Sequence, residues 1–284
     1  MFTPTRRSRP FTSRAPLGLK ILVGFVLLFL YCPFGIIMLY AFTTEETAFT
    51  FPPPGLTADW FRVALFERPD IFPPLFLSVQ VALVATFVAL VLGSLIAFGI
   101  SRTKFFGREA ITFLVLLPIA LPGIITGISL RSAFGLFGID FSFWTIVIGH
   151  ATFCIIVVYN NVIARIRRTA GALDEASADL GADYWQTFRF VMFPQMRTAL
   201  LAGGLLAFAL SFDEVVVTIF TSGAQQTLPI WIFATLARPA QLPIVNVVAL
   251  FVIIASIIPV YFAQRLAGGG RDDDRARTIP TAAP

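Results

Sequence analysis

The sequence is poor in cysteine, histidine and charge, and each shortage disfavours a class of protein. Of its 284 residues two are cysteines, Cys32 and Cys154, and both lie in apolar segments, so no disulfide framework is implied. The single histidine, His150, leaves no histidine cluster for a metal site. Charged residues make up 13% of the chain and hydrophobic residues 57%, a balance that disfavours a soluble domain. The sequence predicts an integral membrane protein.

Several catalytic and nucleotide-binding motifs are also missing. The sequence has no Gly-x-x-x-x-Gly-Lys-Ser/Thr loop, so the chain is not expected to bind ATP by the usual route. It has no His-Glu-x-x-His and no Gly-x-Ser-x-Gly, which disfavours an intramembrane enzyme. Energy for any transport must therefore come from a partner chain or from an ion gradient.

Six apolar stretches are long enough to cross a bilayer, at about 20 residues each. They predict an all-α membrane protein with six transmembrane helices: Leu17 to Phe42, Leu75 to Ile100, Ala110 to Ser132, Phe143 to Ile163, Ala199 to Phe220 and Ile244 to Gln264. The third stretch holds Pro118, Pro122, Gly123 and Gly127. Proline removes backbone donors and bends helices, so this span is expected to be kinked or locally unwound. Broken helices of this kind line translocation paths, but kinked helices with only a structural role are also common.

The distribution of basic residues predicts the orientation. The terminal segments and the loops 101–109 and 164–197 hold 17 of the 21 Lys and Arg residues, which places both termini and these loops in the cytoplasm. The net charge of +5 therefore reflects topology and not nucleic-acid binding. We divide the chain into a basic cytoplasmic segment (1–16), a six-span permease domain (17–266, with the cytoplasmic loop 164–197) and a disordered cytoplasmic tail (267–284).

The longest polar interval between apolar segments, residues 173–194, has the pattern of two short helices. Asp174 is expected to cap the first helix and Gly181 to end it. Asp183, with a glutamine three residues later, predicts a capping box that opens the second helix. Pro194 is expected to stop this second helix before the next span.

This interval resembles the signature loop of the permease subunits of binding-protein-dependent ABC importers. The family pattern is Glu-Ala-Ala, three residues, Gly, nine residues, Ile, one residue, Leu-Pro. Every spacing is kept here, and the matching residues are Glu175, Ala176, Ser177, Gly181, Val191, Phe193 and Pro194. Three of them depart conservatively from the pattern: Ser177 stands for Ala, Val191 for Ile and Phe193 for Leu. An ordinary amphipathic helix at the membrane interface is the alternative explanation for the same apolar face.

The resemblance implies a type I importer permease in the inner membrane of a bacterium. In that family the loop docks on a cytoplasmic ABC ATPase dimer, which binds ATP and Mg, so this chain itself would need no cofactor. The implied partners are a second permease, which we expect to be a homologous different chain, and an extracytoplasmic substrate-binding protein. The residues implied in ATPase coupling are Glu175, Ala176, Ser177, Gly181, Trp185 and Pro194.

The fifth span carries the candidate substrate-path residues Ser211, Asp213 and Glu214. Read as one continuous helix, it places Gly203, Ala207 and Ser211 in a ladder of small residues on one face, with Glu214 continuing this face and Asp213 pointing elsewhere. Carboxylates in a membrane span are costly unless they pair or face water, which makes them candidates for binding a cation. The alternative is a structural role, in which they bond neighbouring backbone, Thr218 or a partner subunit.

The stretch from Ser211 to Val217 also resembles the permeases of the spermidine/putrescine importer subfamily. The resemblance implies a polyamine or a related organic cation as substrate. Other substrates in the family, such as amino-acid derivatives, thiamine and ferric iron, remain alternatives. Two other classes also remain open: an ion-coupled secondary transporter that uses Asp213, Glu214 and His150, and a membrane scaffold that transports nothing. The lack of a visible inverted repeat argues against the first.

Overall fold

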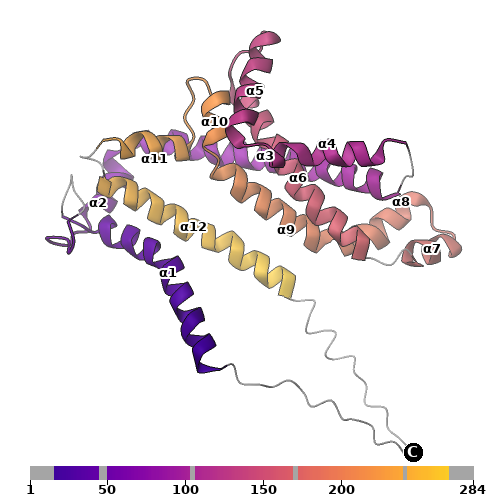
Figure 1. Cartoon of the computed structure of the whole chain (residues 1–284), viewed down its shortest axis with the longest axis horizontal. Coiled ribbons are helices and arrows are strands. Elements are labelled where there is room, and N and C mark those ends of the chain that lie inside the picture. Colours follow the sequence, from indigo (N-terminus) through magenta and orange to yellow (C-terminus); the bar gives the residue numbers. More distant parts are fainter. Residues whose placement is uncertain (1–15, 45–49, 103–105, 169–171, 239–241, 269–284) are drawn as a thin grey trace, which may run out of the picture.

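The computed structural model describes residues 16–44, 50–102, 106–168, 172–238 and 242–268 (Figure 1). Within these ranges the regular structure is helical, and the only β-type pairing is an isolated bridge between Thr43 and Leu56. The all-α prediction is confirmed. The predicted segment 1–16 and the tail 267–284 lie almost entirely outside the described residues.

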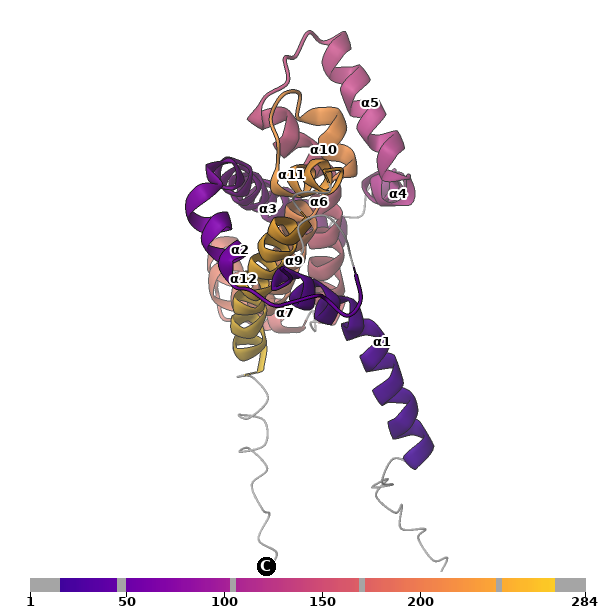
Figure 2. The ribbon, with the colours of Figure 1, turned by 90° about the vertical axis from the view of Figure 1, so that its left-hand side faces the viewer.

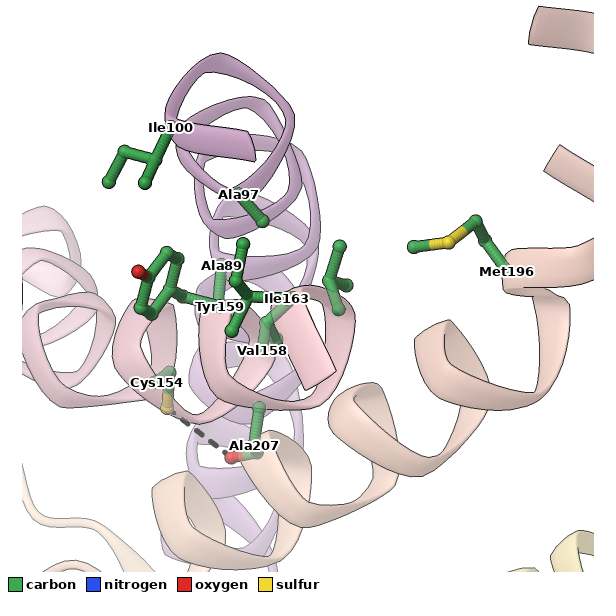
Figure 3. Packing of buried hydrophobic residues seen from close by; sticks show 10 residues of the cluster. Ala89, Ala97, Ile100, Cys154, Val158, Tyr159, Ile163, Met196 and Ala207 are labelled. Atoms are coloured by element: carbon green, nitrogen blue, oxygen red, sulfur yellow. Dashed lines mark hydrogen bonds between the residues drawn. The ribbon is translucent and has the colours of Figure 1, made fainter. Parts of the chain in front are cut away.

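Three long helices form the packed centre: α3 (Phe72–Arg102), α6 (Phe143–Arg168) and α9 (Phe193–Phe212). Figure 3 shows side chains from all three meeting in one apolar cluster. In this cluster the thiol of Cys154 donates a hydrogen bond to the carbonyl oxygen of Ala207, with 3.3 Å between the sulfur and the oxygen. Cys154 is thus a buried filler between α6 and α9, as its apolar surroundings predict. The clustered residues are Ala89, Ala97, Ile100, Cys154, Val158, Tyr159, Val162, Ile163, Met196 and Ala207.

Small residues allow these helices to approach each other closely. Gly93 and Ala97, four residues apart on α3, are both buried against α6. A Cβ atom at Gly93 would lie 2.7 Å from the carbonyl oxygen of Ile155 and 3.1 Å from the amide nitrogen of Tyr159. Both of these are backbone atoms of α6, so they cannot rotate away as a flexible side chain would.

We therefore expect Gly93→Ala to destabilise the protein by about 1–3 kcal/mol, the usual cost of overpacking a core. Gly99→Ala is the matched control, because Gly99 lies in the same helix and a Cβ atom there would meet nothing within 4 Å. Thermal unfolding of the two variants in detergent measures the difference. Equal melting temperatures for both variants would show that α3 and α6 can separate at little cost.

The third predicted span is two helices, α4 (Arg108–Ala120) and α5 (Gly123–Leu136). They meet at Leu121 and Pro122 with a bend of 106°. The predicted break is therefore confirmed, but it is far sharper than a proline kink. Pro118 lies inside α4 and does not end it, whereas Pro122 immediately precedes α5. Two extended residues separate the helices, so their backbones are not tied by an i→i−4 hydrogen-bond ladder.

The fifth predicted span is also interrupted, and here the expectation of one continuous helix is wrong. Helix α9 ends at Phe212, and α10 (Val216–Thr221) begins after three intervening residues. The predicted ladder of Gly203, Ala207 and Ser211 is confirmed, since all three are buried. Glu214 does not continue their face, because it lies outside the helix. A further helix, α11 (Leu228–Leu236), follows.

The remaining helices are α1 (Leu17–Ala41) and α12 (Leu242–Gly268), with a short helical run between α1 and α3 made of α2 (Asp59–Arg62), Val63–Glu67 and Pro69–Ile71. Helix α1 leans away from the central helices in Figure 2 and is almost entirely exposed. An apolar helix with so little protein around it suits a position in lipid. The α2 region and α11 lie at one end of the long helices, and α7 (Ala172–Asp179) and α8 (Tyr184–Gln186) lie at the other (Figure 1).

Among the described residues four helices are long and apolar enough to cross a membrane, and the bent pair α4 and α5 would make a fifth. The described apolar part of α12, Leu242–Ile257, is shorter than these. The count of six spans and the cytoplasmic location of the termini therefore stay predictions.

Candidate functional site: the loop 173–194 and the break after α9

The first short helix of the loop, α7, ends in a turn built on Gly181. This glycine has φ +80°, in the left-handed region that residues with a side chain rarely adopt. The amide of Ala182 donates to the carbonyl of Ser177 over 3.1 Å, and the amide of Gly181 donates to that of Ala178 over 2.9 Å. These two bonds form a Schellman motif, in which the residue after the helix is usually glycine. The prediction that Gly181 ends this helix is confirmed.

The second helix opens with the predicted capping box. The amide of Gln186 donates to Oδ1 of Asp183 over 2.7 Å, and the amide of Asp183 donates to Oε1 of Gln186 over 2.9 Å. The prediction that Pro194 stops this helix is wrong. Helix α8 continues through the π-helical segment Thr187–Met192 directly into α9, and Pro194 lies in the first turn of α9. Proline is tolerated at the start of an α-helix, and the change from π to α hydrogen bonding falls at this point.

Asp174 does not cap the first helix as predicted, because α7 begins two residues earlier at Ala172. Its carboxylate instead forms an ion pair with Arg102 at the end of α3, and the same Nη2 of Arg102 lies 3.5 Å from the sulfur of Met192. Sequence reasoning used Arg102 only as a positive charge for orientation. Nothing in the local pattern pairs two residues that lie 72 positions apart.

Two further contacts hold the loop against the spans. The hydroxyls of Ser177 and Thr187 lie 2.9 Å apart and join α7 to the second helix. The ring of Phe188 lies with its centroid 5.6 Å from the ring of Trp185 and 5.7 Å from that of Phe98 on α3. The loop is therefore fastened to α3 by an ion pair and by an aromatic contact.

The outer surface of this loop exposes large apolar side chains. Leu180 is 89% exposed, Tyr184 77% and Trp185 62%. Glu175 and Ala176 are also exposed, whereas Ser177 is buried. An exposed apolar patch with polar surroundings is typical of a surface that contacts another protein. We call this surface the loop face; it comprises Leu173, Glu175, Ala176, Leu180, Tyr184, Trp185 and Phe190.

The two acids of the fifth span lie in the break between α9 and α10. Asp213 is exposed, and no hydrogen bond or ion pair of its carboxylate is found among the residues that the structure describes. Glu214 is half-buried, and its Oε1 accepts a hydrogen bond of 2.9 Å from the amide of Val217. The carbonyl of Glu214 accepts a bond of 2.7 Å from the hydroxyl of Thr218. Glu214 thus caps the first turn of α10, which is one of the structural roles considered above.

Ser211 is buried and does not face solvent. Its hydroxyl lies 2.8 Å from Nδ1 of His150, and Nε2 of the same ring lies 2.8 Å from the hydroxyl of Thr218. His150 is therefore a hydrogen-bonded contact between helices, as its position in an apolar span favours. Within the described residues no group of three His, Cys, Asp or Glu side chains comes close enough to hold a metal ion.

At the opposite end of the long helices a polar cluster joins the α2 region to α11. Nε and Nη2 of Arg68 each donate a bond of 2.8 Å to Asp70, and the indole N–H of Trp231 donates to Asp70 over 3.1 Å. The hydrogen bonds to Asp70 raise the pKa of Arg68. The amide of Leu228 at the start of α11 donates to the hydroxyl of Ser78 over 2.7 Å. These contacts fasten α11 to α3 and to the segment that precedes it.

The sequence matches a known family of membrane transport proteins. The family model described as "Binding-protein-dependent transport system inner membrane component" matches residues 89–268, which include the loop face and the break after α9. The chain belongs to this family. It is therefore a permease subunit of a binding-protein-dependent ABC importer, in the inner membrane.

Individual relatives extend the match over most of this permease. The spermidine/putrescine transport system permease protein PotC of Haemophilus influenzae is 30% identical over 237 residues, which cover 83% of this chain and 91% of that protein. The putrescine transport system permease protein PotI of Escherichia coli is 30% identical over 270 residues, which cover 90% and 94%.

Two solved structures share the fold of this permease. One is a bacterial ABC transporter involved in the import of the acidic polysaccharide alginate, with a TM-score of 0.60, 18% identity and coverage of 92% of this chain and 99% of that one. The other is an amino acid ABC transporter, with a TM-score of 0.57, 15% identity and coverage of 74% and 98%. The predicted importer permease fold is confirmed.

Proposed function

We propose that this permease forms the translocation path for a polyamine, spermidine or putrescine, and that the loop 173–194 couples the path to a separate cytoplasmic ATPase. A second permease completes the path, and a binding protein delivers the polyamine from outside. ATP and Mg are bound by the ATPase and not by this chain. The observation that carries the proposal is the exposed carboxylate of Asp213 at a helix break, in a chain whose relatives are spermidine/putrescine and putrescine permeases.

The coupling part of the proposal is supported by the loop face. Its apolar side chains are exposed, and burying them against a protein partner would stabilise the complex. The loop is also mechanically fixed, since the Schellman turn at Gly181 sets the direction of α7 and the Arg102–Asp174 ion pair ties α7 to α3. Motion of an ATPase bound to this face would therefore be passed to α3 and α9. Nucleotide on one side and the loaded binding protein on the other would bias two states of the bundle.

The substrate part is supported by charge. A carboxylate in the membrane region is costly unless it faces a partner or water, and Asp213 is exposed with no bonding partner among the described residues. A primary or secondary ammonium group of a polyamine would form a charge-assisted hydrogen bond with it. Glu214 contributes a second negative charge one residue away, although its Oε1 is also used in capping α10.

The test is ATP hydrolysis by this chain reconstituted with its candidate partner permease, ATPase and binding protein, with and without spermidine or putrescine. We expect polyamine to stimulate hydrolysis. Asp213→Asn should raise the polyamine concentration for half-maximal stimulation by about tenfold, the effect of losing one charge-assisted contact. Glu214→Gln should have a smaller effect, because its amide oxygen can still cap α10. Asp140→Asn, which removes another exposed acid between α5 and α6, should change nothing.

The outcomes separate the parts of the proposal. Stimulation that is unaffected by Asp213→Asn keeps the polyamine importer and contradicts the role of the acid. Lack of stimulation by either polyamine contradicts the substrate. Loss of uptake when the proton gradient is collapsed at constant ATP would favour an ion-coupled transporter instead.

A further inference from the structure

The imidazole of His150 joins the two helices on either side of the break that carries Asp213 and Glu214. Nδ1 lies 2.8 Å from the hydroxyl of Ser211 in the last turn of α9, and Nε2 lies 2.8 Å from the hydroxyl of Thr218 in the first turn of α10. The side chain is 1% exposed, so water cannot replace either partner. No motif and no periodicity of the sequence links this histidine to the break.

The direction of each hydrogen bond follows from the number of protons. The hydroxyl of Thr218 has one proton, and it donates this proton to the carbonyl oxygen of Glu214 over 2.7 Å. It must therefore accept from His150, which places the ring proton on Nε2. In a neutral ring Nδ1 then accepts from the hydroxyl of Ser211. A chain of bonds results, from Ser211 through the ring and Thr218 to the backbone of Glu214.

This series of hydrogen bonds fixes the break at both ends. Ser211 is one residue before Phe212, where α9 ends, and Thr218 lies in α10, which Glu214 also caps through the amide of Val217. Of the three residues between the helices, Asp213 donates its amide to the carbonyl of Ala209 over 3.2 Å, and the carbonyl of Val215 accepts from the amide of Ile219 over 3.0 Å. The break is therefore tied to the ends of both helices, and contacts on each side influence its conformation. The ring of His150 makes contacts on both sides.

We propose that His150 is a positioning residue that holds the α9–α10 break so that the carboxylates of Asp213 and Glu214 keep the spacing required by a polyamine. The inference rests on the proposed function, because it assumes that the acids meet the substrate. His150 itself does not contact the substrate, since it is buried among the helices. Loss of the ring should therefore change which polyamine is preferred more than it changes the amount of folded protein. Spermidine and putrescine differ in length and charge number, so they report on this spacing.

The sharpest variants are at the threonines of α10. Thr218→Val replaces the hydroxyl bonded to His150 with a methyl group of similar size. Thr221→Val is the matched control, because Thr221 is equally buried in the same helix and also donates to the carbonyl four residues earlier, over 3.0 Å. Of the two, only Thr218 lies within hydrogen-bond distance of the His150 ring. His150→Phe removes both bonds and His150→Gln keeps a donor and an acceptor.

The measurement is the ratio of spermidine to putrescine concentrations for half-maximal stimulation of ATP hydrolysis by the reconstituted complex. We expect Thr218→Val and His150→Phe to shift this ratio by about tenfold, the effect of one misplaced charge-assisted contact. The double variant should shift this ratio no further than either single variant does. His150→Gln should shift the ratio less than His150→Phe, and Thr221→Val should leave the ratio unchanged. If the His150→Phe permease fails to assemble into the complex, the ratio measured for Thr218→Val tests the inference by itself.

An unchanged ratio in Thr218→Val, when Asp213→Asn does shift it, would overturn the inference and leave the proposed function intact. A ratio that Thr221→Val shifts as strongly as Thr218→Val would also overturn it, since any buried hydroxyl of α10 would then suffice. If Asp213→Asn changes neither the half-maximal concentrations nor their ratio, the proposed role of the acids fails and the inference fails with it.

Discussion

Replacing Gly181 with valine is expected to lower polyamine-stimulated ATP hydrolysis by about ten- to a hundredfold while the chain still inserts normally. The φ of +80° at this residue costs a β-branched side chain about 1–3 kcal/mol, and this cost corresponds to the expected range. The strain is in the backbone alone, since a Cβ atom at this position would meet nothing within 4 Å. The Schellman turn would open, and α7 would lose its fixed direction relative to α8.

Asparagine at the same position is the control for this prediction, because it tolerates the left-handed conformation far better than valine does. Gly181→Asn adds a side chain of comparable bulk to the same open space. It should therefore keep most of the hydrolysis and most of the ATPase association, as measured by co-purification of the ATPase with the permease. A valine variant that binds and drives the ATPase normally would show that the loop face does not depend on this turn.

Reversing the charge of Arg102 is the second large effect that we expect. Arg102→Glu would set a carboxylate against that of Asp174 and remove the contact with the sulfur of Met192. Like charges at this distance repel, so α7 would detach from the end of α3. ATP hydrolysis should continue but transport should fall by about tenfold or more, because the two helices would no longer move together.

The double variant Arg102→Glu/Asp174→Arg restores an ion pair with opposite polarity and should recover a large part of transport. Arg167→Glu is the control, because Arg167 is exposed at the end of α6. This substitution also removes one basic residue from the predicted cytoplasmic side. Uptake of labelled polyamine per ATP hydrolysed is the measurement. A double variant no better than Arg102→Glu would show that the charge of Arg102 acts through another group.

Several features of the candidate site could be predicted from the sequence because they depend on residues close together in the chain. The capping box at Asp183 needs only a partner three residues later, and the turn at Gly181 needs only a residue that accepts a positive φ. The ladder of Gly203, Ala207 and Ser211 follows from helical periodicity, and its burial against other helices follows from residue size. The break in the third span was foreseen because proline acts on its own neighbours.

Other expectations failed where a distant partner or a different backbone hydrogen-bond pattern prevailed. Asp174 reads locally as a helix cap, but α7 begins before it, and its carboxylate forms an ion pair with Arg102 at the end of α3. Pro194 reads as a helix stop, but it lies in the first turn of α9, directly after the π-helical segment ends, where proline is tolerated. The fifth span conceals the end of α9, since apolar residues on both sides of Asp213 and Glu214 make one run of membrane-spanning length and the break holds no proline or glycine.

Composition and short-range spacing suffice to predict the class of protein, its apolar helices and the two helices of the loop 173–194, because they fix hydrophobicity, caps and turns. The packing of the helices adds that Asp213 is exposed, that Ser211 is buried against His150, and that Arg102 holds the loop. These outcomes depend on which side chains meet after the helices pack. Residues 61 to 72 positions apart along the chain become hydrogen-bonding neighbours only in the folded protein.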